Sequence, residues 1–200
     1  MTSFFSSLFS NALAPIKGAQ NVAGFKCGWH EDIGRRPTLE DRVAVREFVA
    51  KPFNKKASRG KETRAAYFAV FDGHGGDECA AYLEKHLPAR VESALAKRAD
   101  ECVIYTSGIS KLQEVARSEL ATAEVLTACY EAEDAEICRS PAGISGSTAA
   151  TLLLLGNRLF CANVGDSRVI LCRAGRVNNV QFLLEAGWML FALNVGFLFA

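Results

Sequence analysis

The sequence predicts a fold of the α+β class, in which buried strands carry two long amphipathic helices. Two observations predict it. Short apolar runs bounded by glycine or turn residues recur between positions 43 and 173, as buried strands require. Two longer segments, 77–98 and 109–138, repeat their apolar residues at helical spacing instead, which is typical of helices laid on a sheet.

Composition limits the classes of function. At 200 residues the chain is long enough for one domain with its own core. Half of the residues are hydrophobic and the formal net charge is +1, so nothing indicates a nucleic-acid partner. The seven cysteines show no Cys-x-x-Cys and no zinc-like spacing. Their odd number, and the places of Cys79, Cys129, Cys161 and Cys172 in predicted strands and helices, predict buried free thiols in a reducing compartment, the cytoplasm or the nucleus.

One predicted strand runs directly into a cluster of chemically active residues. Tyr67–Phe71 is a continuous apolar run, and Asp72-Gly73-His74-Gly75-Gly76 follows it. A buried strand with this ending places a carboxylate and an imidazole at its tip, while the glycines let a ligand approach the main chain. Such a tip is a rigid support for a metal or phosphate site. The alternative is that Asp72-Gly73 only reverses the chain as a hairpin turn.

A second group of charged residues precedes another predicted strand. Arg35-Arg36 and Glu40-Asp41 lie in a proline-containing loop that leads into the valine-rich segment 43–49. Adjacent carboxylates repel each other unless a cation is near, so Glu40 and Asp41 are candidates to support a metal ion. Arg36 is a candidate to bind phosphate, because a guanidinium can match two phosphate oxygens at once. The alternative is a solvated loop whose charges compensate one another.

A predicted hairpin carries the third group. Segments 151–155 and 158–164 are apolar and are joined by the two-residue turn Gly156-Asn157. The hairpin ends in a Gly-Asp-Ser-Arg sequence at 165–168, and a further strand is predicted at 169–173. Ser147-Thr148, ahead of the hairpin, is interpreted as small residues of the core, since no base partner for a nucleophile is evident.

Taken in order, these motifs resemble those of the metal-dependent protein phosphatases, the type 2C serine/threonine phosphatases. The resemblance covers about residues 25–177, which corresponds to the first half of a family catalytic domain. It implies that the chain holds part of a four-layer αββα sandwich, in which antiparallel sheets are flanked by antiparallel helices. The motifs that carry it are Arg36…Glu40-Asp41, Phe71-Asp72-Gly73-His74-Gly75-Gly76, Ser145-Gly146-Ser147-Thr148-Ala149 and Val164-Gly165-Asp166-Ser167-Arg168.

The resemblance also implies a hydrolase mechanism. Members of this family hold two divalent ions per complete site, Mn²⁺ or Mg²⁺, which activate a water molecule for attack on a phosphoserine or phosphothreonine phosphorus. By similarity, Asp72 bridges the two ions and Gly73 offers its backbone carbonyl to them. Arg36 binds the substrate phosphate. The implied partners are therefore phosphoserine and phosphothreonine proteins.

The remaining motif residues have supporting roles by the same similarity. His74 is the general acid that protonates the leaving alkoxide, a role suited to an imidazole near neutral pH. Glu40 and Asp41 orient the waters that the metal ions bind. Asp166 supports the sheet and the edge of the site and is not counted as a metal ligand.

The sequence divides into three segments on these grounds. Residues 1–22 form an N-terminal lead, 23–177 the N-terminal portion of a phosphatase domain, and 178–200 an unrelated apolar tail. The tail differs abruptly in composition from what precedes it. Two later family motifs, each of which supplies a metal carboxylate, have no counterpart in it. We therefore expect a phosphatase that is truncated and catalytically impaired.

Two alternatives stay open at this point. The first is a non-catalytic fragment that binds phosphoproteins or competes with a full-length relative, which the missing carboxylates favour. The second is a tail-anchored membrane protein, because 180–200 is nearly all apolar and a membrane span needs about 20 such residues. Gln181, Glu185 and Asn194 inside that segment count against the second alternative.

Overall fold

The computed structural model describes residues 18–22, 25–50, 63–101, 111–156, 158–173, 176–179 and 190–194. The regular elements are listed here in chain order: β1 (Gly18–Val22), β2 (Phe25–Trp29), β3 (Arg42–Ala50), β4 (Thr63–Phe71), β5 (Gly73–His74), α2 (Glu78–Glu101), α3 (Lys111–Ile137), the 3₁₀ turn η2 (Pro141–Ile144), β6 (Gly146–Ser147), β7 (Ala149–Leu155), β8 (Arg158–Val164), β9 (Ile170–Arg173), β10 (Arg176–Asn179) and β11 (Leu190–Asn194).

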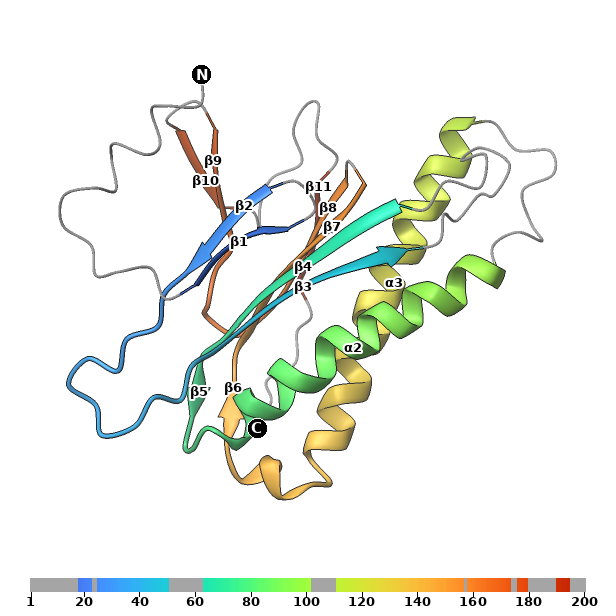
Figure 1. The fold of residues 1–200 in the computed structure, drawn as a ribbon. Helices are drawn as coiled ribbons and strands as arrows, with labels where there is room; N and C mark the ends of the chain where they lie inside the picture. The colour runs from blue at the N-terminus through green and yellow to red at the C-terminus, as the bar shows by residue number, and fades with distance from the viewer. Residues whose placement is uncertain are drawn as a thin grey trace.

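A five-stranded sheet organises the molecule. Its strand order is β11-β8-β7-β4-β3, and α2 and α3 lie together on one of its faces (Figure 1). The predicted antiparallel arrangement is confirmed for every pair of described strands but one, since β11 pairs with β8 in parallel. Three two-stranded ladders complete the sheets: β1 with β2, β9 with β10, and β5 with β6.

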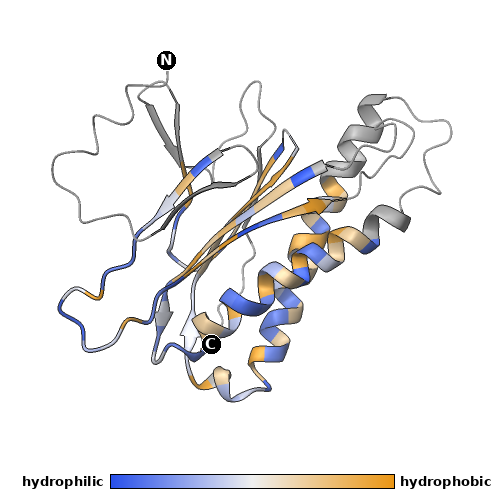
Figure 2. Cartoon of the chain, viewed as in Figure 1, coloured by the Kyte–Doolittle hydropathy of each residue, from blue (hydrophilic) through white to orange (hydrophobic). Residues whose placement is uncertain are grey.

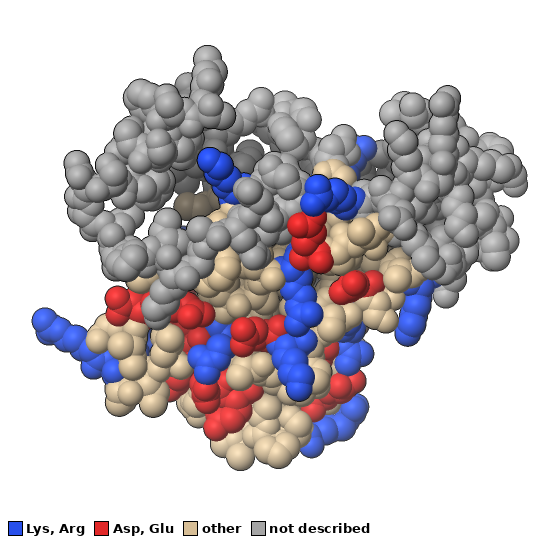
Figure 3. Space-filling model, viewed as in Figure 1, with Lys and Arg blue, Asp and Glu red and all other residues tan. Residues whose placement is uncertain are grey.

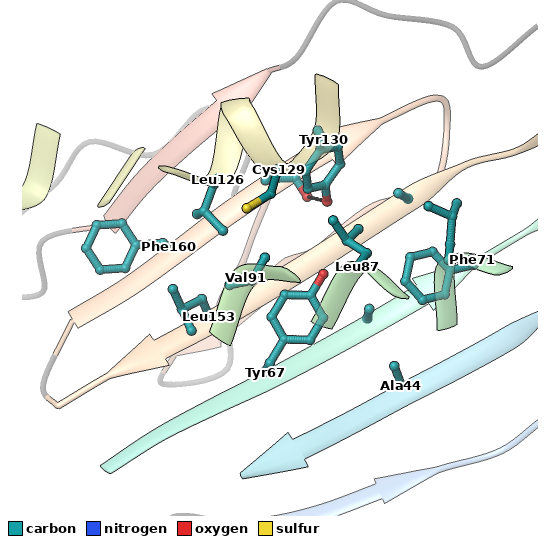
Figure 4. Packing of buried hydrophobic residues seen from close by; sticks show 14 of the residues in the cluster. Ala44, Tyr67, Phe71, Leu87, Val91, Leu126, Cys129, Tyr130, Leu153 and Phe160 are labelled. Atoms are coloured by element: carbon teal, nitrogen blue, oxygen red, sulfur yellow. Dashed lines mark hydrogen bonds between the residues drawn. The ribbon is translucent and has the colours of Figure 1, made fainter. Parts of the chain in front are cut away.

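The main core lies between this sheet and the two helices. Because side chains alternate along a strand, β4 turns Tyr67, Ala69 and Phe71 toward the helices, and all three are buried. Helix α2 meets them with a stripe of fully buried side chains that recur about every fourth residue, as a core-facing helix requires. The stripe consists of Leu83, Leu87, Val91 and Leu95. Figure 4 shows Tyr67 and Phe71 of β4 next to Leu87 and Val91 of this stripe, with Leu126 and Tyr130 of α3 in the same cluster.

The two helices run antiparallel and are joined by a polar network that reaches from the buried Glu133 to the exposed Glu136. Arg90 of α2 donates to Glu133 of α3 at 2.5 Å and to Glu136 at 2.6 Å. Tyr82, two turns earlier on α2, donates to the second carboxylate oxygen of Glu136 at 3.0 Å. Figure 2 shows that each helix carries both apolar and polar stripes, and that much of the neighbouring sheet is apolar.

The opposite face of the sheet is covered only in part by the described residues. The β1–β2 ladder contributes Cys27, which packs with Val45, Phe68 and Leu159 around a small apolar cluster. Val70, on the same face of β4, remains 47% exposed. Within the described ranges, therefore, a helix layer covers one face of the sheet, and short ladders are what the structure shows of a further layer.

Several sequence predictions can be checked here. Cys79, Cys129 and Cys161 are free and buried, as predicted, whereas the side chain of Cys172 lies outside the described residues. Of the other described cysteines, Cys27 is half-buried and Cys138 is exposed. No helix within the described ranges is long and apolar enough to cross a membrane. The N-terminal lead up to residue 17 lies outside the described residues. Of the apolar tail, 190–194 forms β11, and the segment boundaries after 22 and 177 stay predictions.

Candidate metal and phosphate site

Asp72 lies at the end of β4, between that strand and a very short one. The neighbours of β4 are β3 and β7, and Asp72 leads into β5, which pairs with β6. The pairing places Gly73 opposite Ser147 and His74 opposite Gly146. Asp72-Gly73 is therefore not the turn of a hairpin, because β4 and β5 do not pair. This arrangement brings two motifs that are far apart in the sequence to one end of the sheet (Figure 1).

The backbone of Asp72 is clamped by Thr148. The amide of Asp72 donates to Oγ1 of Thr148 at 3.1 Å, and the amide of Thr148 donates to the carbonyl of Asp72 at 2.9 Å. Oγ1 of Thr148 also shares a 2.6 Å hydrogen bond with Oγ of Ser167. Thr148 is buried, as expected for a core residue. Its role as a clamp was not predicted, because a Ser-Thr pair in a sequence does not show which main-chain atoms it will meet.

The carboxylate of Asp72 lies among charges from two other segments. Partial burial raises its pKa, and the nearby carboxylates of Asp41 and Asp166 raise it further. Arg36 acts in the opposite direction and lowers it. Residues from the loop before β3, the end of β4 and the end of β8 therefore meet at one place. All four of these residues, three acids and one arginine, belong to the motifs identified in the sequence.

Glu40 passes close to Gly73 and to the following turn. A Cβ atom at position 73 would lie 2.5 Å from the carbonyl oxygen of Glu40, so only glycine allows this approach. The Glu40 side chain accepts weakly from the amide of Gly76 at 3.4 Å and from the hydroxyl of Thr38 at 3.2 Å. The predicted neighbourhood of Glu40 and the Asp72 motif is thus present in the structure.

His74 is exposed and rests against the backbone of Gly146. A Cβ atom at position 146 would overlap Nε2 of the His74 ring, so the ring position depends on this glycine. The structure gives His74 no hydrogen bond with Asp41, Asp72 or Asp166. It lies two residues from Asp72 and faces solvent, where a leaving group of a substrate could reach it.

Arg42 joins the acidic loop to the start of α2. Its guanidinium donates to the carbonyls of Leu39 at 3.1 Å and Asp41 at 2.7 Å, and it also pairs with Asp77. The first turn of α2 is fixed from a second side, because Oγ of Ser145 accepts from the amide of Cys79 at 2.9 Å. Neither Arg42 nor Ser145 was predicted to position the site, and each does so through backbone atoms that sequence patterns do not show.

The acids around Asp72 fit part of the shell of a divalent cation. Three carboxylates of like charge gather there, and a hard cation with oxygen ligands would relieve their repulsion. Within the described ranges, however, no three His, Cys, Asp or Glu side chains converge as a metal-binding group. The arrangement can therefore hold an ion through Asp72 and water molecules, with Arg36 beside it to attract an anion.

Comparisons with known proteins give three findings. The model of the family described as "Protein phosphatase 2C" matches residues 30–183. The chain is similar to "Probable protein phosphatase 2C 52" of Oryza sativa subsp. japonica, with 29% identity over 80% of this chain and 27% of the relative. "Probable protein phosphatase 2C 47" of the same plant is 32% identical over 80% of this chain and 38% of its own length.

A solved structure shares the fold. It is the serine-threonine phosphatase 2C of Toxoplasma gondii, with a TM-score of 0.54 and 20% identity over 75% of this chain and 46% of that one. The chain thus spans less than half the length of these relatives, which places it opposite only a part of each of them.

Proposed function

Because the chain belongs to the protein phosphatase 2C family, we propose that it supplies the phosphate-binding and metal-bridging part of a site that hydrolyses phosphoserine and phosphothreonine in proteins. The observation that carries the proposal is the meeting of Asp72 with Asp41, Asp166 and Arg36. A cluster of acids beside a single arginine suits a cation and a phosphate that bind next to each other.

The motif residues divide the tasks of this proposal among them, and Asp166 adds negative charge beside Asp72. Asp72 and the carbonyl of Gly73 would hold the ions, and Thr148 keeps the Asp72 backbone in place. Glu40 and Asp41 would orient water molecules that the ions bind. When bound, Mn²⁺ or Mg²⁺ supplies Lewis acidity and lowers the pKa of a coordinated water.

Arg36 and His74 act on the substrate. Arg36 is exposed and its guanidinium is near Asp72, so it can grip two oxygens of the phosphoryl group as that group approaches. His74 is exposed at the neighbouring position and can give its proton to the serine or threonine oxygen that leaves. The free, buried thiols support a reducing compartment, the cytoplasm or the nucleus, as the place of action.

A second candidate function is binding of phosphoproteins without hydrolysis. It is favoured by the absence, within the described ranges, of three converging metal-ligating side chains. Two dications about 3.5–4 Å apart need several carboxylates to offset their repulsion. We infer that these 200 residues by themselves bind a phosphorylated peptide through Arg36 but do not turn it over.

The two functions are separated by assaying one phosphopeptide in two contexts. The first is the 200-residue chain, and the second is the same chain joined to the later part of a family domain. We expect Mn²⁺-dependent phosphate release only in the extended protein, and Asp72→Asn should abolish it. In that protein Arg36→Ala should mainly raise KM, whereas the neighbouring Arg35→Ala is the matched control. Robust turnover by the 200-residue chain that disappears with Asp72→Asn would contradict the non-catalytic proposal.

A further inference from the structure

A groove separates α2 from α3 at a place remote from the Asp72 motif in the fold. It encloses about 550 Å³, within the usual range for small-molecule sites. Small side chains on both helices create it, because they leave unfilled the space that larger residues occupy between packed helices. The small residues that line it are Ala89, Ser93 and Ala94 of α2 and Ala128 and Ala132 of α3.

The groove contains a buried carboxylate that is only half satisfied. The side chain of Glu133 is 1% exposed and lines the groove. Its Oε1 accepts from Nε of Arg90 at 2.5 Å, whereas its Oε2 is buried and has no hydrogen-bond partner. A buried charged oxygen without a donor is costly, so such an atom calls for a partner that the described side chains do not supply.

The charges around Glu133 indicate what kind of partner this is. Arg90 also donates to Glu136 at 2.6 Å, so one guanidinium is shared between two carboxylates. The hydrogen bond from Arg90 lowers the pKa of Glu136, which keeps that carboxylate ionised at neutral pH. The trio therefore carries +1 from Arg90 and −2 from the two acids, a net charge of −1. The other charged side chains of the lining, Lys97 and Glu124, carry opposite charges and lie toward the other end of the groove. At Glu133, therefore, a cationic donor would complete the trio and an anion would be repelled.

The shape of the groove determines which kind of body the ligand can have beside its cationic group. From Arg90 to Lys97 its α2 wall extends over seven residues, or about 10 Å along the helix axis, and Ala89 and His86 continue the wall on the other side of Arg90. Between these ends the floor is apolar and includes Val125 and Cys129. A ligand that fits has a primary ammonium at one end and a slender apolar body of several methylene groups.

We propose that the groove between α2 and α3 is a binding site for a small alkyl amine, whose ammonium donates to Glu133 while its chain lies over Val125, Ala128 and Ala132. Figure 3 shows why the charge of the head group alone would not select this place, because acidic and basic side chains are interspersed over the described part of the helix face. Selection comes from the buried carboxylate and the apolar channel together. The site is independent of the proposed phosphatase chemistry.

Hexylamine and its neutral counterpart hexanol test the proposal on the full chain. Titrations at neutral pH would be followed by the NMR shifts of the methyl groups of Val125 and Ala128. We expect hexylamine to bind at least about tenfold more tightly than hexanol, since a hydrogen bond to a charged group adds that much affinity. Glu133→Gln should remove the preference. Equal affinity for the two compounds, or no binding of either, would overturn the proposal.

A second pair of variants tests the groove without disturbing the buried Arg90–Glu133 pair, whose loss could unfold the protein. Ala128→Leu fills the groove from an exposed position and leaves Glu133 and Arg90 intact. Ala135→Leu lies on the same helix outside the groove and is the matched control. Hexylamine binding should be lost in the first variant and kept in the second. Binding that persists in Ala128→Leu would show that the amine lies elsewhere and would refute the assignment.

Discussion

The helix-covered core and the Asp72 edge meet on a single strand, β4, yet they treat polar groups in opposite ways. Toward the core, β4 buries Tyr67, and burial raises the pKa of both Tyr67 and Tyr130, so these hydroxyls stay neutral. Tyr130 shares a 2.8 Å hydrogen bond with Thr151 inside the core. At the end of the same strand, Asp72 lies among carboxylates of like charge.

The contrast shows that the residues that stabilise the fold and the charged residues of the candidate site lie in different regions. The core gains stability from buried apolar area and from neutral hydroxyl pairs. The edge gathers carboxylates of like charge, whose repulsion a cation would relieve, and such clusters are common at functional sites. Mutations in the two regions should therefore differ in the sign of their effect on stability as well as in its size.

The largest effect is expected in the core. Leu87→Ala removes a fully buried side chain of α2 and should lower the free energy of unfolding by about 2–5 kcal/mol. The matched control is Leu120→Ala on α3, where the leucine is 60% exposed and the change should stay within about 0.5 kcal/mol. Urea denaturation measures both. Equal losses would contradict the placement of the core.

A substitution at the Asp72 edge should act in the opposite direction. Asp72→Asn removes one of the mutually repelling charges and should leave Tm unchanged or raise it in metal-free buffer at neutral pH. Asp77→Asn is the control, because Asp77 pairs with Arg42 and its loss should lower Tm. Thermal unfolding of the two variants tests the comparison. A clear loss of stability in Asp72→Asn would show that its charge is compensated in the folded chain.

Gly146, at the Asp72 edge, should affect the position of the His74 ring more than the stability of the fold. Gly146→Ala introduces a Cβ atom where the His74 ring lies, and the exposed ring can move aside. Tm should change little, whereas the NMR signals of the His74 ring should shift. The ring of His86, which stacks on Tyr82 with 4.1 Å between centroids, provides an internal control that should not move. Unshifted His74 signals would disprove the contact.

A further effect appears only at alkaline pH. Burial raises the pKa of the Cys79, Cys129 and Cys161 thiols from 9.0 to about 11. A group whose pKa is raised by folding favours the folded state below its unfolded pKa, and this contribution is lost as the pH rises through the folded pKa. Stability should thus decline between pH 9 and 11, which urea midpoints can follow. At pH 8 iodoacetamide should label the exposed Cys138 before these three thiols.

Much of the core could be predicted from the sequence. The strands at 43–49, 67–71, 151–155 and 158–164 lie within β3, β4, β7 and β8, and the segments 77–98 and 109–138 correspond to α2 and α3. Long periodic segments can be predicted in this way because burial of one face determines their structure. The resemblance placed Arg36, Asp41 and Asp72 in one site, and the structure brings them together.

The edge was less predictable, for physical reasons. The ladder of Gly73–His74 with Gly146–Ser147 is two residues long, too short for any periodic signal. The clamp of Thr148 on Asp72 and the bridge from Arg42 to Asp77 depend on tertiary contacts between distant segments. The parallel pairing of β11 with β8 was not foreseen either, because a short apolar run does not reveal its partner.

The most direct test of the central claim is Mn²⁺ binding by the 200-residue chain, measured from the electron paramagnetic resonance signal of free Mn²⁺. The account predicts one weakly bound ion, lost in Asp72→Asn and retained in the Asp77→Asn control. Binding that is unchanged in Asp72→Asn, or two tightly bound ions in the 200-residue chain, would contradict it.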